Sequence, residues 1–329
     1  MIKIQYCDRE WVEKCHLEYV KKRIKKSAAD MKSKSMEELE ILLDLRKKLN
    51  KSIPLDDGME SISKIAICPY LEELVAIQKE WFKLFNEDDG AVLSKAIKNL
   101  LKYDSFYNGL EIEIDQKKIQ WNRQKLLMKN STEICPYCGR QYITSWQEKS
   151  TASCDHYYPK ELYPLLSINM YNLVPSCYIC NSVLKGENVK KESDLHLYPY
   201  QDASEILKFK VKIEDVESLY NISKEANSIE LIISQEDDEL KTLRAEKSLE
   251  LFKLQEVYQY HAEDAFKLRK ALKEESSEAY QKIFSENYKQ LENLSEYAFS
   301  YRQKDMSEEP LVKLKRDIEE QFKESGEKT

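Results

Sequence analysis

The chain of 329 residues contains little glycine and little proline, with 6 and 8 residues respectively. Both residue types disfavour regular helices, and charged residues make up 34% of the chain, so the composition predicts a mainly helical protein. No two glycines lie closer than 19 positions apart. Because a loop that cradles phosphate groups needs clustered glycines, this spacing excludes a P-loop or a dinucleotide-binding fingerprint. We therefore expect that the chain does not itself bind and hydrolyse ATP.

Long hydrophobic runs are also missing from the sequence. No run of about 18 or more apolar residues occurs, which excludes a helix that crosses a membrane. The first residues are interrupted by charges at Lys3, Asp8 and Glu10 and lack the apolar centre of a signal peptide. We therefore expect a cytoplasmic protein that does not bind membranes. In that reducing compartment the 8 cysteines are not expected to form a disulfide framework.

The net charge of −7 is unusual for a protein that binds nucleic acid, but the distribution of charge matters more than its sum. Residues 1–50 and residues 121–191 each carry a net charge of +4, so the rest of the chain carries −15. The run 21–34 holds seven basic residues and one acidic residue. This run fits either contact with a nucleic-acid backbone or a solvated helix face.

The pattern of apolar residues divides the chain into three regions. Residues 1–128 show helical spacing over 8–50, 69–87 and 91–103, which predicts a helical N-terminal domain. Residues 129–200 are dense in cysteine, proline and tyrosine and form the second region. Residues 201–329 begin with two alternating stretches at 208–216 and 228–234 that predict strands, and helices follow from residue 240 and over about 277–300. The charged tail after Ser307 is expected to fray.

Two CxxC pairs stand in the second region. The first comprises Cys135 and Cys138, and the second comprises Cys177 and Cys180. Two such pairs in an intracellular protein fit a tetrahedral site of four thiolates that holds a structural zinc ion. The alternative is four ordinary core cysteines, which the paired spacing makes less favoured. The 38 residues between the pairs exceed the gap of a simple zinc ribbon, so a folded element must occupy it.

The second cysteine pair opens a predicted helix. The segment between the pairs predicts strand, long loop, strand and then helix, with Ser176 as the N-cap and Gly186 as the stop. Within that helix Cys177, Asn181 and Lys185 recur every four residues, so they are expected to share one face.

The polar residues of this region resemble the signature of the HNH, or ββα-metal, nuclease family. The signature is carried by Asp155-His156 with the following residues to Lys160, by Asn172, and by Asn181 after the last cysteine. The third signature position is asparagine instead of histidine, a variant that the family accepts. The resemblance implies a mainly α chain with a small zinc-stapled ββα-metal module, α+β overall, whose activity is endonucleolytic cleavage of phosphodiester bonds.

The resemblance assigns two catalytic residues. Cleavage of a phosphodiester needs an activated water, and His156 has the pKa range of a general base. Asn172 would hold His156 in orientation. The alternative for His156 is a satisfied core histidine, but the preceding Asp155 and the flanking cysteine pairs favour the catalytic role.

Metal and phosphate contacts follow from the same resemblance. Asp155 and Asn181 would supply hard oxygen ligands for one catalytic Mg²⁺ or Mn²⁺, which thiolates would not favour. Lys160 and Lys185 are candidate contacts to nucleic-acid phosphates. Zinc would therefore serve folding, and the second metal would serve cleavage.

Three functions remain open from the sequence. A nuclease that acts on DNA is favoured, but a nuclease that acts on RNA or tRNA uses the same chemistry. A non-catalytic zinc module that binds nucleic acid or protein explains the cysteines but leaves Asp155, His156 and Asn181 without a role. The helices after the signature resemble nuclease subunits of bacterial anti-phage systems of the Septu type, also found beside retrons. That resemblance implies a partner protein with ATPase activity.

Overall fold

The structure is a computed structural model that describes residues 1–34, 63–83, 87–146, 149–202, 204–213, 227–234, 238–276 and 299–324. Helices dominate, and these residues hold four two-stranded antiparallel sheets, so the fold is α+β. None of the helices in this part of the chain is long and apolar enough to cross a membrane.

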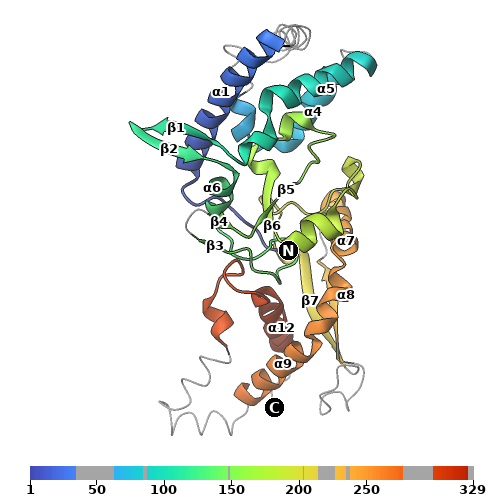
Figure 1. Cartoon of the computed structure of the whole chain (residues 1–329). Helices are drawn as coiled ribbons and strands as arrows, with labels where there is room; N and C mark the ends of the chain where they lie inside the picture. Colours follow the sequence, from blue (N-terminus) through green and yellow to red (C-terminus); the bar gives the residue numbers. More distant parts are fainter. Residues whose placement is uncertain are drawn as a thin grey trace.

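Three helices gather at one end of the molecule, namely α1 (Arg9–Lys34), α4 (Leu71–Lys83) and α5 (Glu87–Leu101) (Figure 1). These helices confirm the predicted ones within the described residues, although the predicted run 35–50 lies outside them. The break predicted at 88–90 is wrong, because these residues belong to α5. The helices bury leucine, valine and tryptophan at helical spacing, and α4 and α5 pack against the short helix η3 (Pro164–Leu166).

The N-terminal region is not wholly helical as predicted. Strands β1 (Leu110–Ile114) and β2 (Lys117–Trp121) pair as a hairpin, with Ile114 opposite Lys117. Ile112 and Ile114 of β1 are buried, whereas Glu111 and Glu113 are exposed, which is the alternation of a half-buried strand. The two turn residues, Asp115 and Gln116, both have positive φ, as the tight turn of a hairpin requires. After the hairpin, Asn122 caps the short helix α6 (Arg123–Met128).

The first six residues lie against the cysteine-rich region and not against these helices. The amide of Ile2 donates to the carbonyl of Pro136 at 2.9 Å, and the amide of Ser131 donates to the carbonyl of Gln5 at 2.8 Å. Met1, Ile2 and Ile4 are buried. The N-terminal segment therefore packs on the cysteine-rich region.

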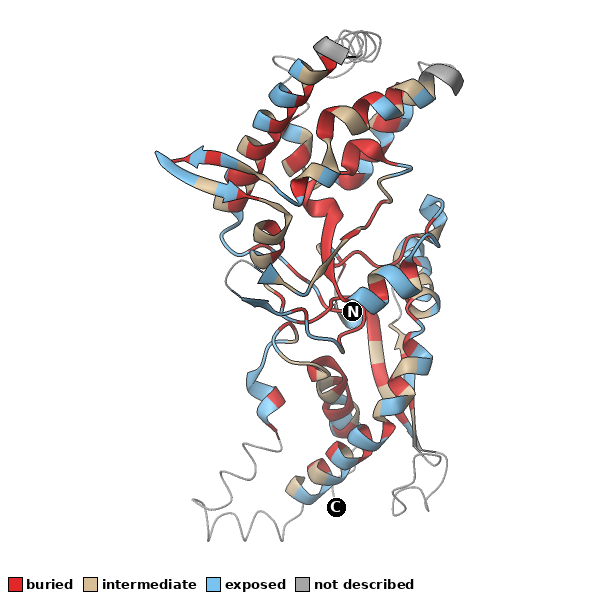
Figure 2. Cartoon of the chain, viewed as in Figure 1, coloured by how far each residue is buried: buried red, intermediate tan, exposed pale blue. Residues whose placement is uncertain are grey.

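Strands β5 (Ser153–His156) and β6 (Leu173–Ser176) lie at the centre of the molecule, and Figure 2 shows this centre mostly buried. They pair in antiparallel fashion with His156 opposite Leu173. Between them run η3 and η4 (Met170–Asn172), and after them comes the helix η5 (Ile179–Lys185). The predicted order of strand, loop, strand and helix is therefore present. A small hairpin, β3 (Ser145–Trp146) with β4 (Lys149–Ser150), precedes it.

The helix after β6 differs from the prediction in its start. It is a π-helix, and Ser176 does not cap it, because the hydroxyl of this buried serine makes no hydrogen bond in the described part of the chain. Gly186 ends the helix as predicted, with a φ of +42° that suits glycine.

The other end of the molecule is built on a long ribbon of β7 (Leu207–Ile213) and β8 (Asn227–Ile233), which confirms the predicted strands over 208–213 and 228–233. Residues 214–216 of the first predicted strand, and most of the helix predicted over about 277–300, lie outside the described residues. Around it pack α7 (Glu239–Leu251), α8 (Leu254–Tyr258), α9 (Ala262–Ser276) and α12 (Val312–Glu324). The predicted fraying after Ser307 is wrong over α12, because Val312, Leu314 and Ile318 bury an apolar stripe against the ribbon and α9.

Candidate functional site

The four predicted zinc ligands lie together. The sulfur atoms of Cys135, Cys138, Cys177 and Cys180 lie within 4.8 Å of one another, and all four residues are buried. The amide of Cys180 donates to Sγ of Cys177 at 3.4 Å, a hydrogen bond that favours a thiolate. Gly139 turns the first pair with a φ of +62°. A buried cluster of four sulfur donors fits a soft or borderline metal such as zinc.

His156 ends β5 at the side of a cavity of about 750 Å³. Its Nε2 lies 3.0 Å from the carbonyl oxygen of Ser167, and the ring of Tyr103 packs edge-on against it at 4.4 Å. A carbonyl only accepts, so Nε2 carries the proton and Nδ1 keeps a lone pair. Burial lowers the pKa of His156 to about 4, so the imidazole is neutral at pH 7. The residue is therefore in the form that a general base requires.

Asn172 acts on the backbone that follows His156, not on its imidazole. Its Oδ1 accepts from the amide of Tyr158 at 2.7 Å, and its Nδ2 donates to the carbonyls of Tyr158 and Leu166 at 3.0 and 3.1 Å. The carbonyl of Asn172 accepts from the amide of Tyr157 at 2.9 Å. Because Asn172 is fully buried, all these bonds are shielded from water. The predicted orienting role is compatible with this clamp, although it works through the main chain.

Asp155 and Lys185 form a buried ion pair. The Lys185 ammonium lies 2.6 Å from Oδ2 of Asp155, and the Tyr137 hydroxyl donates to the same oxygen at 2.5 Å. Although burial acts against the charged form, the Lys185 charge and the two hydrogen bonds hold the pKa of Asp155 below its ordinary value. Both bonds are made to Oδ2, so Oδ1 is the oxygen left for a cation.

Lys185 therefore does not lie where the predicted phosphate contact would need it. Its side chain is only 3% exposed, and it also donates to the carbonyl of His156 at 2.6 Å. Cys177 lies before η5 and belongs to the sulfur cluster, whereas Lys185 is the last residue of η5 and bonds to Asp155 and His156 of β5, so the predicted shared helical face does not describe their positions. We correct its role to the partner of Asp155.

Asn181 and Lys160 both line the cavity beside His156. Asn181 is partly exposed, and among the described residues its side chain makes a single long hydrogen bond, donated to Ser182 at 3.3 Å. Lys160 pairs with Asp104 at 3.1 Å and lies 5.1 Å from the centre of the Tyr103 ring. The predicted metal ligands Asp155 and Asn181 thus share one cavity with His156.

Two further cations at this cavity escaped the sequence reasoning. Arg123 comes from the first turn of α6, and Lys190 follows η5. Within the described ranges neither makes an ion pair, whereas Lys160 and Lys185 are both paired with carboxylates. Tyr103, from η2 (Tyr103–Phe106), completes this side. No motif marks Arg123 in the sequence, because only the fold of the N-terminal region brings it to β5.

The helices of the N-terminal region hold the long loop between β5 and β6. Gln78 of α4 accepts from the amide of Leu165 at 3.1 Å and donates to the carbonyl of Leu162 at 2.9 Å. Asn169 donates to the carbonyls of Ile65 and Cys68 at 2.5 and 2.9 Å. The site is therefore assembled from the first two of the three regions of the chain.

Two curated proteins share a short region of similar sequence with this chain. Protein ea31 of Escherichia phage lambda is 36% identical over 78 residues, which is 23% of this chain and 24% of that protein. Septu protein PtuB of Bacillus thuringiensis is 35% identical over 66 residues, which is 20% of this chain and 24% of that protein. The similarity thus spans about a quarter of the length of each relative.

No protein-family model matches the chain, and no solved structure matches it. The similarity to a Septu protein agrees with the predicted resemblance to Septu-type subunits, and the buried four-cysteine cluster agrees with the predicted metal site. The HNH assignment stays a prediction.

Proposed function

We propose that this chain is a metal-dependent endonuclease of the HNH type that hydrolyses phosphodiester bonds, with DNA favoured over RNA. One observation carries the proposal: His156, whose Nε2 is held by Ser167 and whose Nδ1 has no hydrogen bond among the described residues, shares a cavity with the oxygen donors Asp155 and Asn181. Zinc would occupy the four-cysteine cluster, where it would join the catalytic helix to the segment before β3.

The side chains around the cavity suit this chemistry. His156 would remove the proton of the attacking water through Nδ1, since Nε2 is held by Ser167. Arg123 and Lys190 line the cavity and have no carboxylate partner among the described residues, so they would contact phosphate oxygens. Asp155 and Asn181 would hold Mg²⁺ or Mn²⁺, which supplies charge stabilisation on the phosphate when bound.

Cleavage assays separate the candidate functions. The full chain is incubated with supercoiled plasmid or total RNA, with Mg²⁺, Mn²⁺ or a chelator. We expect metal-dependent cleavage of the plasmid, loss of that activity in His156→Ala, and retention in His261→Ala, since His261 lies outside the cavity. Cleavage of RNA alone would favour the RNA nuclease. Equal cutting by wild type and His156→Ala would reject the active site, and no cutting by any sample with zinc bound would favour a binding module.

We further propose that the nuclease acts in anti-phage defence with a partner ATPase. The similarity to Septu protein PtuB supports this role. The lack of clustered glycines requires that any ATP hydrolysis come from another chain. The acidic regions outside residues 1–50 and 121–191 repel phosphates and are better suited to contact a protein. Co-expression with neighbouring genes, followed by pull-down and cleavage assays, tests this proposal; a monomer that cuts at full rate without a partner contradicts it.

A further inference from the structure

Four consecutive carbonyls run past the Asn172 clamp, and each accepts a hydrogen bond. Three of the donors are tyrosine hydroxyls: Tyr6 donates to Met170 at 2.7 Å, Tyr198 donates to Tyr171 at 2.7 Å, and Tyr200 donates to Leu173 at 3.1 Å. The fourth carbonyl, that of Asn172, accepts from the amide of Tyr157, the residue after β5. Tyrosines from two distant segments thus hold the main chain on both sides of Asn172.

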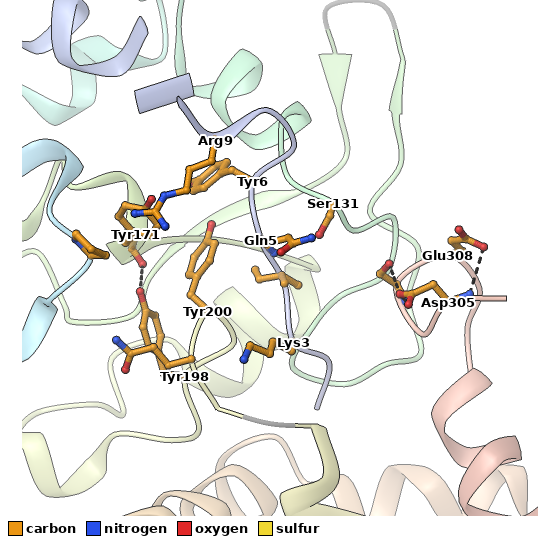
Figure 3. Close-up of a pocket in the computed structure, with 14 residues that line it drawn as sticks. Lys3, Gln5, Tyr6, Arg9, Ser131, Tyr171, Tyr198, Tyr200, Asp305 and Glu308 are labelled. Carbon is orange, nitrogen blue, oxygen red and sulfur yellow. Dashed lines mark hydrogen bonds between the residues drawn. The ribbon is translucent and has the colours of Figure 1, made fainter. Parts of the chain in front are cut away.

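These tyrosines line a second cavity of about 640 Å³, which Figure 3 shows. The Tyr6 and Tyr200 rings stack at 5.4 Å with an interplanar angle of 19°, and the Tyr198 ring lies 5.7 Å from Tyr200. Tyr171 packs edge-on against both Tyr6 and Tyr200, at 5.8 and 5.7 Å. Because the rings pack against one another, each tyrosine hydroxyl is held close to the carbonyl that it bonds.

The segment 170–173 therefore links the three tyrosines to the Asn172 clamp. Its carbonyls accept the three tyrosine hydrogen bonds, and the Asn172 side chain bonds to the amide and the carbonyl of Tyr158. Of these four residues Tyr171 lines the second cavity, and none is among the residues that line the cavity of His156. Leu173 is also the strand partner of His156. A shift of residues 170–173 would therefore move both β6, which pairs with His156, and the backbone at Tyr158 that follows His156.

We infer that Tyr6, Tyr198 and Tyr200 are positioning residues of the candidate active site. Their hydroxyl groups hold the backbone of residues 170–173, and these residues hold His156 and Tyr158 in place. The inference rests on the proposed nuclease function for its kinetic consequence, but the structural coupling can be measured without activity. The tyrosines touch neither His156 nor the cavity that it lines.

Tyrosine-to-phenylalanine variants test the inference, because they remove one hydroxyl and keep the ring. Tyr198→Phe is compared with Tyr301→Phe, whose hydroxyl also makes a buried bond, at 2.6 Å to Glu319, but at the C-terminal end of the chain. In the full metal-loaded chain we expect Tyr198→Phe to lower kcat about 5- to 10-fold with KM unchanged, and Tyr301→Phe to change neither. Tyr6→Phe and Tyr200→Phe are expected to act in the same direction.

Hydrogen exchange of the Tyr158 amide, which donates to Asn172, is the readout that needs no nuclease. We expect faster exchange in Tyr198→Phe than in wild type, and wild-type exchange in Tyr301→Phe. Faster exchange in a protein that cuts no substrate would support the positioning role and reject the nuclease. Equal exchange in all three proteins would overturn the inference, whatever the activity.

Discussion

Lys185 shows how one buried charge can organise a site. Its ammonium reaches Asp155 and the carbonyls of His156 and Tyr157 at 2.6, 2.6 and 3.4 Å, so it joins η5 to the end of β5. The Asp155 carboxylate it faces is 5% exposed. At such burial, the attraction within the pair offsets a large desolvation cost only while both partners are present.

Replacement of Lys185 by methionine is therefore expected to destabilise the protein by about 3–5 kcal/mol, since it leaves Asp155 buried without its cation. Urea unfolding at pH 7 measures the change. Lys160→Met is the matched control, because the Asp104 partner of Lys160 is 91% exposed, and about 1 kcal/mol or less is expected there. Similar losses in both variants would contradict the structural role of Lys185.

His16 predicts how stability depends on pH. It is fully buried, its Nε2 lies 2.7 Å from the carbonyl of Ile168, and its Nδ1 accepts from Trp121 at 3.3 Å. Burial lowers its pKa to about 4. The unfolded chain binds a proton near pH 6.5 while the folded chain does not, so stability is full above pH 6.5 and falls as the pH drops toward 4.

Each pKa unit corresponds to about 1.4 kcal/mol, so His16 alone is expected to remove roughly 3 kcal/mol over that interval. Glutamine offers a donor and an acceptor without titrating, so His16→Gln is expected to lose less stability than wild type between pH 7 and pH 4. Urea unfolding at several pH values makes the comparison. An unchanged slope would show that His16 does not stay neutral in the fold.

At the scale of elements, the sequence predicted those strands and helices whose residues show a regular local pattern. The strands at 208–216 and 228–234 were visible because apolar and polar residues alternate, and the site elements were visible from the spacing of cysteines and signature residues. The hairpin of β1 and β2 was missed because its turn, Asp115-Gln116, lacks the glycine that marks most such turns. Likewise, α12 was not predicted, because its many charged residues outnumber the few apolar residues that it buries.

Contacts between distant segments could not be predicted in this way. Nothing in the sequence around Arg123 or Tyr103 relates them to His156, because their proximity depends on the packing of the N-terminal helices against η3. The burial of Lys185 is a similar case, because the four-residue spacing of Cys177, Asn181 and Lys185 predicted a helix but not which residues Lys185 would contact.

The ribbon of β7 and β8 has its two open edges closed by side chains. On β7, Gln321 of α12 accepts from the amide of Val211 at 2.8 Å and donates to its carbonyl at 3.1 Å. On β8, Gln255 of α8 caps the other edge. It accepts from the amide of Leu231 at 3.0 Å and donates to the carbonyl of Ile229 at 2.6 Å. An isolated two-stranded ribbon is marginal in water, so these caps contribute to its stability.

Gln321→Ala is expected to destabilise the protein by about 1–3 kcal/mol, because it leaves a partly buried amide and carbonyl of Val211 without partners. Thermal unfolding and hydrogen exchange of β7 measure the effect. The exposed Gln303→Ala is the control and is expected to lie within about 0.5 kcal/mol of wild type. Unchanged exchange of the Val211 amide in Gln321→Ala would show that the cap contributes nothing.

At the scale of the whole molecule, the four-cysteine cluster joins both ends of the chain. The amide of Ile2 reaches Pro136 within the first CxxC pair, and the amide of Leu311 donates to the carbonyl of Gly139 at 3.0 Å. The Tyr258 hydroxyl donates to the carbonyl of Cys138 at 2.6 Å. A metal at this cluster would therefore stabilise the N-terminal segment, α8 and the start of α12 together with η5.

The purified protein is accordingly expected to contain about one zinc ion per chain, held by the four cysteines. Cys177→Ala is expected to lose the zinc and to expose both ends of the chain to protease, since the metal contributes directly to folding. Cys68→Ala, whose partly buried thiol lies outside the cluster, is the control and is expected to keep the zinc. Elemental analysis and limited proteolysis give the readouts. Folded wild-type protein without zinc would refute the metal assignment. Zinc loss that leaves both termini protected would refute the connection between the cluster and the ends, because those contacts would then hold without the metal.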